Sequence, residues 1–274
     1  MNFSLKNLIA SLFFILSLGG VSFIVIDFLQ TKENLMDIEQ YTPKSTLIVP
    51  KEILTRAKYP FVDVHSHLFD MPLRDLSKLT SEMNDLNMAF IINLSGFRGI
   101  YLNQSLENIR KNAPNRVGLF VNIDFEDIDN PLFGELSAKF IDSAASNGAM
   151  GLKVYKSLGL TNKDNKGNRI AVNDPRLDPV WKACGDNNIP VLIHSGEPAS
   201  FWMPKDKFNE RWLELRQKPR RYRDPKKNPS FEEILGEQHE VFRKHPNTIF
   251  INAHLGWMGN DLDRLEGHLD EYPN

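Results

Sequence analysis

Six short segments rich in β-branched and aromatic residues recur from residue 61 onward, and they constrain the fold more than any other feature. They are FVDVH at 61–65, MAFIINL at 88–94, RVGLFVNI at 116–123, GLKVY at 151–155, IPVLIH at 189–194 and TIFINAH at 248–254. Segments of helical character separate them, at 75–87, 103–113, 132–147, 175–188 and 230–245. This alternation predicts a parallel sheet covered by helices, either doubly wound and open or closed into a barrel.

The N-terminal segment 8–26 has 19 consecutive uncharged residues, enough for a helix that crosses a membrane. Lys6 precedes it and acidic residues follow, so the positive-inside rule predicts a cytoplasmic N-terminus and an exported remainder. We expect a signal anchor or transmembrane helix over 1–30, a linker over 31–58, and a membrane-anchored domain in the periplasm or outside the cell. The alternative is a cleaved signal peptide and a secreted protein.

The composition excludes several kinds of binding partner and metal site. With a formal net charge of -2 over 274 residues, the chain has no overall attraction to nucleic acid. Its single cysteine, Cys184, excludes an intrachain disulfide and a cysteine-rich zinc site. A metal ion would therefore be held by histidine, carboxylate or modified lysine.

Histidines gather at the carboxyl ends of three predicted strands. In FVDVHSHL the side chains alternate, so His65 and His67 face the same way as Asp63, while Val62 and Val64 face the covering helices. Two further strands end at His194 and His254. Active sites of barrel enzymes lie at these strand ends, so the four histidines favour a metal centre inside a barrel.

The remaining three histidines, His239, His245 and His268, lie in predicted helices or at helix ends, and we expect them on the surface. The fourth strand carries Lys153 among small and apolar residues that predict its burial. This lysine is either carboxylated and bridges two metals, or binds a substrate anion as an ammonium. A structural pairing with an inner carboxylate is the alternative, and Lys156 is expected to be solvated.

The order VDVHSH, GLKVY, VLIHSGEP and INAHLGW resembles the amidohydrolase superfamily, particularly its amidohydrolase-2 branch of metal-dependent hydrolases and non-oxidative decarboxylases. The resemblance covers residues 59–274 and implies a (β/α)8 TIM-type barrel. It implies that His65, His67 and His194 bind the metal. His254 would bind a second metal or position the hydrolytic water and the substrate.

Eight strands complete that barrel, whereas six are predicted over 59–274. Strand eight supplies a metal-binding aspartate in the family, and no residue of this sequence matches it. We expect a barrel truncated after about six βα units, with strands 7 and 8 absent. The sequence is then a fragment, or the chain is a truncated and inactive product.

The resemblance implies a metal-dependent hydrolase of an amide, ester or lactone bond in a small molecule, acting through a metal-activated water. Zinc is the first metal expected, with manganese or iron as alternatives. A non-oxidative decarboxylase of the same fold is one alternative function, and a non-catalytic membrane-tethered barrel is another.

The segment 195–229 after the fifth strand is longer than ordinary connections, which favours a lid or a specificity element. From 201 to 228 it has ten Lys or Arg against four acidic residues. That balance suits an anionic substrate or lipid head groups, or describes a solvated flap. Glu197, Trp202 and Arg211 are the expected substrate contacts, although packing is the simpler role for Trp202.

Overall fold

The computed structural model describes residues 54–273, which form two compact units. The larger comprises 54–203 and 223–273, and the smaller contains 204–222. No helix among the described residues is both long and apolar enough to cross a membrane. The anchor predicted over 1–30 and most of the linker predicted over 31–58 lie outside the described residues.

The larger unit is built on a six-stranded parallel sheet, as the alternating sequence predicted. The strands follow chain order across the sheet. They are β1 (Phe61–Ser66), β2 (Met88–Asn93), β3 (Val117–Asn122), β4 (Gly151–Val154), β5 (Val191–Ile193) and β6 (Phe250–Asn252). The sheet is an open half-barrel, which fits the barrel prediction for six βα units.

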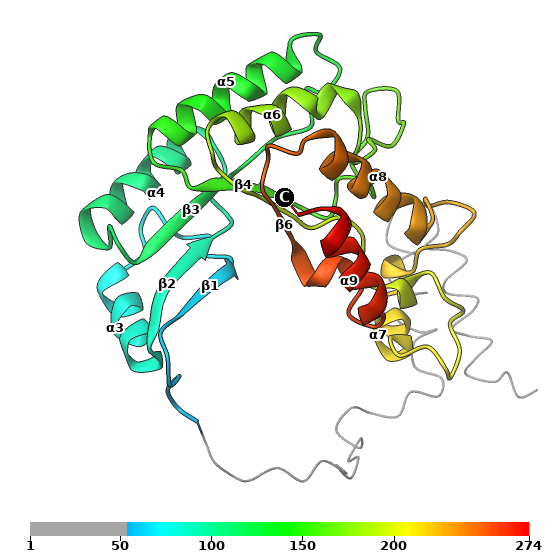
Figure 1. Cartoon of the computed structure of the whole chain (residues 1–274), viewed down its shortest axis with the longest axis horizontal. Coiled ribbons are helices and arrows are strands. Elements are labelled where there is room, and N and C mark those ends of the chain that lie inside the picture. The colour runs from blue at the N-terminus through cyan, green and yellow to red at the C-terminus, as the bar shows by residue number, and fades with distance from the viewer. Residues whose placement is uncertain (1–53, 274) are drawn as a thin grey trace, which may run out of the picture. The chain divides into compact units, whose positions relative to one another are not determined.

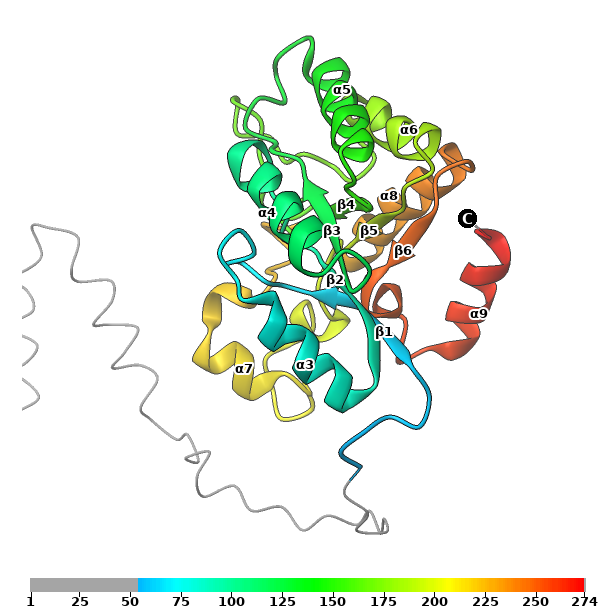
Figure 2. The ribbon, with the colours of Figure 1, turned by 90° about the vertical axis from the view of Figure 1, so that its left-hand side faces the viewer.

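Helices connect successive strands and pack outside the curve of the sheet (Figures 1 and 2). They are α3 (Leu76–Leu86), α4 (Gly99–Asn112), α5 (Phe133–Ser146), α6 (Asp178–Asp186) and α8 (Phe231–Lys244), and α9 (Leu262–Glu271) follows β6. Local signals set their ends: the Ser230 side chain accepts from the Glu233 amide, and Gly148 ends α5 with a φ of 98°.

The main core lies between the sheet and these helices. It includes Leu152 of β4 and Trp181 and Cys184 of α6, each at most 1% exposed. A smaller apolar cluster contains Leu94, Phe120, Leu192 and Ala253. Because apolar side chains occupy both faces of the central strands, those strands have continuous apolar sequences.

The prediction that helices cover Val62 and Val64 is wrong. These side chains are 51% and 40% exposed. Strand β1 is an edge strand of the described sheet, and α3 packs on β2. The register also shifts between Asp63 and Ser66, where three residue steps of β1 match two steps of β2. The alternation still holds from Val62 to His65, with the valines exposed and Asp63 and His65 half-buried, so the valines are uncovered because β1 lies at the sheet edge.

The surface prediction for the other histidines is also wrong. His239 on α8 and His268 on α9 have ring centroids 4.3 Å apart, and His268 is only 8% exposed. Tyr272 packs against both rings, and Arg264 of α9 makes a two-pronged ion pair with Glu232 of α8. The third, His245, contacts Asp178 with its Nε2 at 3.0 Å. All three imidazoles therefore lie at contacts between elements of the fold.

We predict that His239 makes the fold acid-sensitive. Burial, and secondarily the field of His268, lower the pKa of His239 from 6.5 to about 4. The unfolded chain therefore binds a proton before the folded chain does, and stability is lost as the pH falls from 6.5 to about 4. In His239→Phe, which keeps an aromatic ring, the urea midpoint should fall less over this range than in the parent. Parallel pH dependences in the two proteins would contradict the prediction.

The smaller unit contains α7 (Trp212–Gln217) and a 3-10 turn over Pro219–Arg221. The Arg216 guanidinium lies 4.8 Å from the Trp212 ring centroid, and Lys205 lies 4.7 Å from that of Tyr222. Glu214 pairs with Arg211 at 3.3 Å and also with Arg221. Internal contacts thus engage part of the basic charge noted in the sequence.

Candidate metal centre

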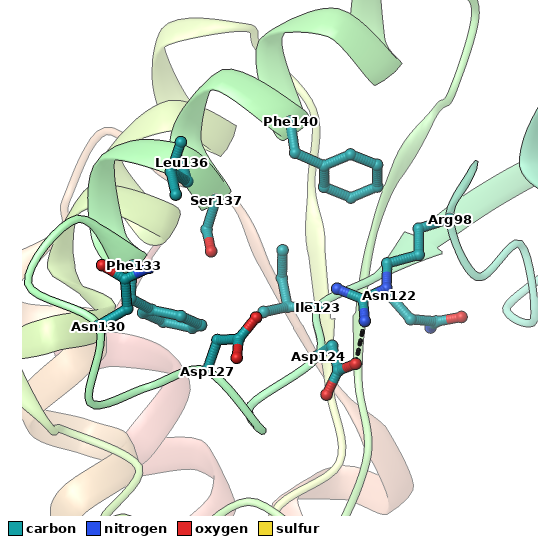
Figure 3. Close-up of a pocket in the computed structure, with 10 residues that line it drawn as sticks. All are labelled: Arg98, Asn122, Ile123, Asp124, Asp127, Asn130, Phe133, Leu136, Ser137 and Phe140. Carbon is teal, nitrogen blue, oxygen red and sulfur yellow. Dashed lines mark hydrogen bonds and ion pairs between the residues drawn. The ribbon is translucent and has the colours of Figure 1, made fainter.

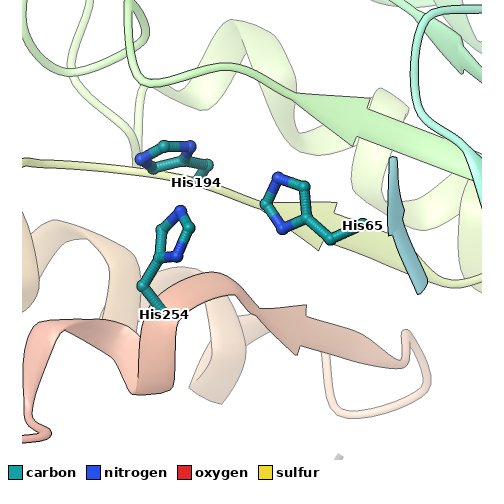
Figure 4. A group of neighbouring side chains, drawn as sticks. All are labelled: His65, His194 and His254. Carbon is teal, nitrogen blue, oxygen red and sulfur yellow. The ribbon is translucent and has the colours of Figure 1, made fainter. Parts of the chain in front are cut away.

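Three histidines from distant parts of the chain meet at the carboxyl edge of the sheet. His65 lies in β1, His194 directly follows β5, and His254 lies two residues after the end of β6. One ring nitrogen from each lies within 4.8 Å of the others, and Figure 4 shows the three rings turned toward a common point. Parallel strands bring such side chains together because their carboxyl ends share one edge.

The donor set suits a divalent metal ion. Two nitrogens bound to one zinc at about 2.1 Å each cannot lie more than about 4.2 Å apart, so small ring movements would close the group. Nε2 of His194 is buried and has no hydrogen-bond partner among the described residues. A buried imidazole nitrogen without a partner is costly, and a metal ligand role would satisfy it.

A left-handed turn positions His254. Residues 254–257 all have positive φ, with φ of 59° at His254, 54° at Leu255, 57° at Gly256 and 62° at Trp257. Consecutive left-handed residues other than glycine are unusual and strained, and such strain clusters at functional sites. At Gly256 an added Cβ would lie 2.5 Å from Nδ2 of Asn252, so the turn requires glycine there.

Trp257 holds this turn against the neighbouring strand. Its Nε1 donates to the backbone oxygen of Ser195 at 2.9 Å. Its ring centroid lies 4.7 Å from that of His254 and 5.5 Å from that of His194. The indole therefore packs against both imidazoles, a role for which no pattern in the sequence provides a signal.

His67 lies next to the three-histidine group but not within it. Its ring centroid is 5.6 Å from that of His65, and the bulge in β1 separates their directions. Nδ1 of His67 lies 2.8 Å from Oγ of Ser95, which lies 3.2 Å from the Tyr155 hydroxyl. Tyr155 also donates to the backbone oxygen of Leu94 at 3.2 Å.

This chain of contacts sets the tautomer of His67. A carbonyl oxygen only accepts, so the Tyr155 proton points to Leu94, and the Ser95 hydroxyl then donates to Tyr155. Oγ of Ser95 is left to accept from Nδ1–H of His67. Nε2 of His67 consequently keeps its lone pair, which is the state that a metal ligand needs.

Burial and a nearby cation keep the imidazoles neutral. Burial, followed by the field of Lys153, lowers the pKa of His65 to about 4 and that of His194 to about 3. The same two causes, in the same order, lower the pKa values of His67 and His254. Neutral imidazoles are the form that binds metal ions.

Lys153 is buried as predicted, at 1% exposure, and its Nζ has no hydrogen-bond partner among the described residues. Burial lowers its pKa to about 8. The expected structural pairing with an inner carboxylate is not found within the described residues. Lys156 is instead ion-paired to Glu197 at 2.9 Å, so the expectation of simple solvation is incomplete.

The three predicted substrate contacts have different surroundings. Glu197 is 4% exposed and binds both Lys156 and Arg223, the latter at 3.2 Å. Trp202 donates from Nε1 to the Pro229 oxygen at 2.8 Å and packs on Phe231, in line with the packing role. Arg211 belongs to the smaller unit, where it contacts Glu214.

Two cavities flank the carboxyl end of β3. One of about 270 Å³ lies between Arg98 and the start of α5, and Figure 3 shows Asp124 turned toward Arg98 in an ion pair. The other, of about 300 Å³, is lined by Lys153, Tyr155 and Phe125. Ile123 and Asp124 line both cavities and form a shared wall.

Several site residues escaped the sequence reasoning, namely Ser95, Tyr155, Arg223 and Trp257. A signal existed for Tyr155, because in GLKVY it lies two positions after Lys153 and period-two alternation puts both on one face. Ser95 and Arg223 lie in connections, where side-chain direction follows no period.

Comparison with protein families assigns most of the chain to one family. The family model described as amidohydrolase matches residues 54–274. The chain belongs to the amidohydrolase family. The expected family resemblance is thereby confirmed, over the whole range 59–274 proposed from the sequence. No match was found among curated proteins.

Solved structures similar to this chain include both decarboxylases and an amidohydrolase. A 2,6-dihydroxybenzoate decarboxylase complexed with 2,6-dihydroxybenzoate is 14% identical, with 75% of this chain and 70% of that chain covered and a TM-score of 0.49. An amidohydrolase II is 18% identical, with 78% and 74% covered and a TM-score of 0.46. A 5-carboxyvanillate decarboxylase from Novosphingobium aromaticivorans, complexed with manganese, is 13% identical, with 78% and 70% covered and a TM-score of 0.44.

We predict that Gly256→Ala destabilises the folded chain by about 1–2 kcal/mol or more, because alanine is strained at this positive φ and its Cβ meets Asn252. Urea unfolding of the full-length chain measures the change. Gly236→Ala is the matched control, since an added Cβ within α8 meets nothing within 4 Å and should stabilise that helix by about 0.5–1 kcal/mol. Equal effects at the two positions would refute a special requirement at the turn.

Proposed function

We propose that this chain is a metal-dependent hydrolase that cleaves an amide, ester or lactone bond of a small, anionic substrate. The observation that carries the proposal is the convergence of His65, His194 and His254, with an unsatisfied nitrogen on His194. Membership of the amidohydrolase family supports the same reaction class.

His65, His67 and His194 would hold the metal. His67 lies outside the convergent group, so its ring would have to turn toward His65 and His194 to join them, whereas His254 already lies within that group. His194 offers a buried free nitrogen, and the contacts of His67 leave its Nε2 unprotonated. When bound, the metal would supply a water of lowered pKa and polarise the carbonyl group to be attacked. Zinc is the first metal to test, followed by manganese and iron.

His254 would act on protons and on the substrate. It is the most exposed member of the group, and its pKa is lowered by burial and by Lys153. A neutral imidazole at this position can accept a proton from the attacking water and later return it to the leaving group. Its left-handed backbone and the indole of Trp257 limit the directions in which the ring can point. Glu197, Trp202 and Arg211 remain our proposed substrate contacts.

Metal content tests this proposal. The purified full-length chain should contain about one to two equivalents of divalent metal by mass spectrometry of the elements. His194→Ala should lower the metal content at least tenfold at limiting free metal, because it removes a buried nitrogen donor. His239→Phe is the control and should retain the metal, since His239 lies between α8 and α9. Negligible metal in the parent, or equal content in all three proteins, would sink the proposal.

A non-oxidative decarboxylase is the second candidate. The observation that favours it is the unpaired buried ammonium of Lys153 beside the histidines, because a cation there suits an acidic substrate. Two sets of substrates separate the candidates. Release of carbon dioxide from hydroxybenzoates would support the decarboxylase, whereas acid release from simple esters and lactones would support the hydrolase. Loss of either activity in His254→Asn, with metal retained, would support proton transfer by His254.

We also propose that segment 8–26 anchors this domain to a membrane with the domain exported, on the grounds of the uncharged run and the flanking charges. Protease added to intact cells should digest the domain and leave a cytoplasmic control protein intact. A domain protected until the cells are lysed would contradict this orientation.

A further inference from the structure

The ammonium of Lys153 is a charge for which the described fold provides no partner. Its residue is 1% exposed, and Nζ forms neither a hydrogen bond nor an ion pair among the described residues. The Tyr155 ring lies beside it, with its centroid 5.6 Å from Nζ. A buried and unpaired charge is expensive, so its retention calls for a ligand that pairs with it.

The acidic groups nearby do not supply that partner. Asp124 lines the same cavity of about 300 Å³, but it is turned toward Arg98 on the other side of the shared wall (Figure 3). Glu126 also lines the cavity, yet it is exposed to solvent and forms no described ion pair with Lys153. The deepest charge of the cavity is therefore positive and uncompensated.

The rest of the lining defines the kind of molecule that fits. Tyr155 and Phe125 contribute aromatic surfaces, and Ser157 contributes a hydroxyl. The Tyr155 ring also stacks on His67, with centroids 5.8 Å apart and planes inclined by 25°, which places the cavity directly beside the histidines. A ligand here would meet a cation at depth and aromatic walls around its body.

We propose that Lys153 is the anion-binding group of a subsite for a small carboxylate with an apolar body. The carboxylate bound by Lys153 is not the reacting group. It anchors the substrate so that another bond of the same molecule reaches the three histidines. The inference relies on the proposed function only in calling this anion a substrate, since binding itself needs no metal.

The proposal requires that the side chain of Lys153 is protonated and carries no modification. The rival state is the carbamate, in which the neutral amine adds to carbon dioxide and releases a proton. A carbamate is negatively charged and would repel a carboxylate ligand. The two states therefore give opposite results with the same probe.

Benzoate is the probe, and calorimetric titration of the full-length chain is the measurement. The titration is made on the protein as purified and again after the metal is removed with a chelator. We expect benzoate to bind in both states, and Lys153→Met to weaken its binding at least tenfold in both. Lys163→Met is the matched control, because Lys163 lines the same cavity but is exposed, and it should weaken binding less than threefold.

Thermal unfolding of the variants tests whether they are folded, so that a loss of benzoate binding is not mistaken for a loss of structure. Because methionine removes an unpaired buried charge, Lys153→Met should unfold at a higher temperature than the parent in the absence of benzoate. Lys153→Gln serves as a second neutral variant and should also lose benzoate binding. Unchanged benzoate affinity in the folded variants would overturn the subsite.

Incubation of the protein with carbon-13 bicarbonate tests for the carbamate. A labelled carbamate on Lys153, seen by nuclear magnetic resonance in the parent and lost in Lys153→Met, would overturn the proposal. Failure of the metal proposal is separable from failure of the subsite. A chain that contains no metal but binds benzoate through Lys153 refutes the first alone, and a metal-loaded chain indifferent to Lys153 refutes the second alone.

Discussion

The parallel hydrogen-bond register of the sheet is the constraint on which the candidate site depends. Val154 pairs with Ile193, and Ile193 pairs with Asn252, so β4, β5 and β6 end at the same level. The residues that follow these strands emerge at one edge, although nearly 190 residues separate His65 from His254 along the chain. A slip of one residue in any strand would turn its last side chains to the other face.

The periodic part of this arrangement could be predicted from the sequence, and the irregular part could not. All six strands lie where the apolar segments placed them, and Lys153 is buried as its neighbours indicated. Periodicity carries no information about which strand lies at a sheet edge, so the exposure of Val62 and Val64 was mispredicted. It is equally silent about four consecutive left-handed residues, because their conformation depends on packing by Trp257 and on the absence of a side chain at Gly256.

The helix histidines illustrate a different limit. The sequence placed His239 and His268 on helices correctly, but a polar residue type suggested exposure. Their rings are buried because α8 and α9 pack through aromatic and imidazole faces, a tertiary contact that no single helix pattern contains. The free-energy cost of burying a neutral imidazole is modest, so histidine is tolerated at such contacts. A lysine at the same place would need a partner for its charge.

The two cavities beside β3 share a wall of only two side chains, Ile123 and Asp124. Asp124, one of these side chains, is ion-paired to Arg98, and neither partner belongs to the histidine group. The capacity of the site is therefore set by residues that do not take part in its chemistry. Descendants of this chain could accept bulkier molecules through exchanges at Arg98 or Asp124 while the histidines stay unchanged. Because different residues set the cavity volume and the chemistry of the site, substitutions can change one without changing the other.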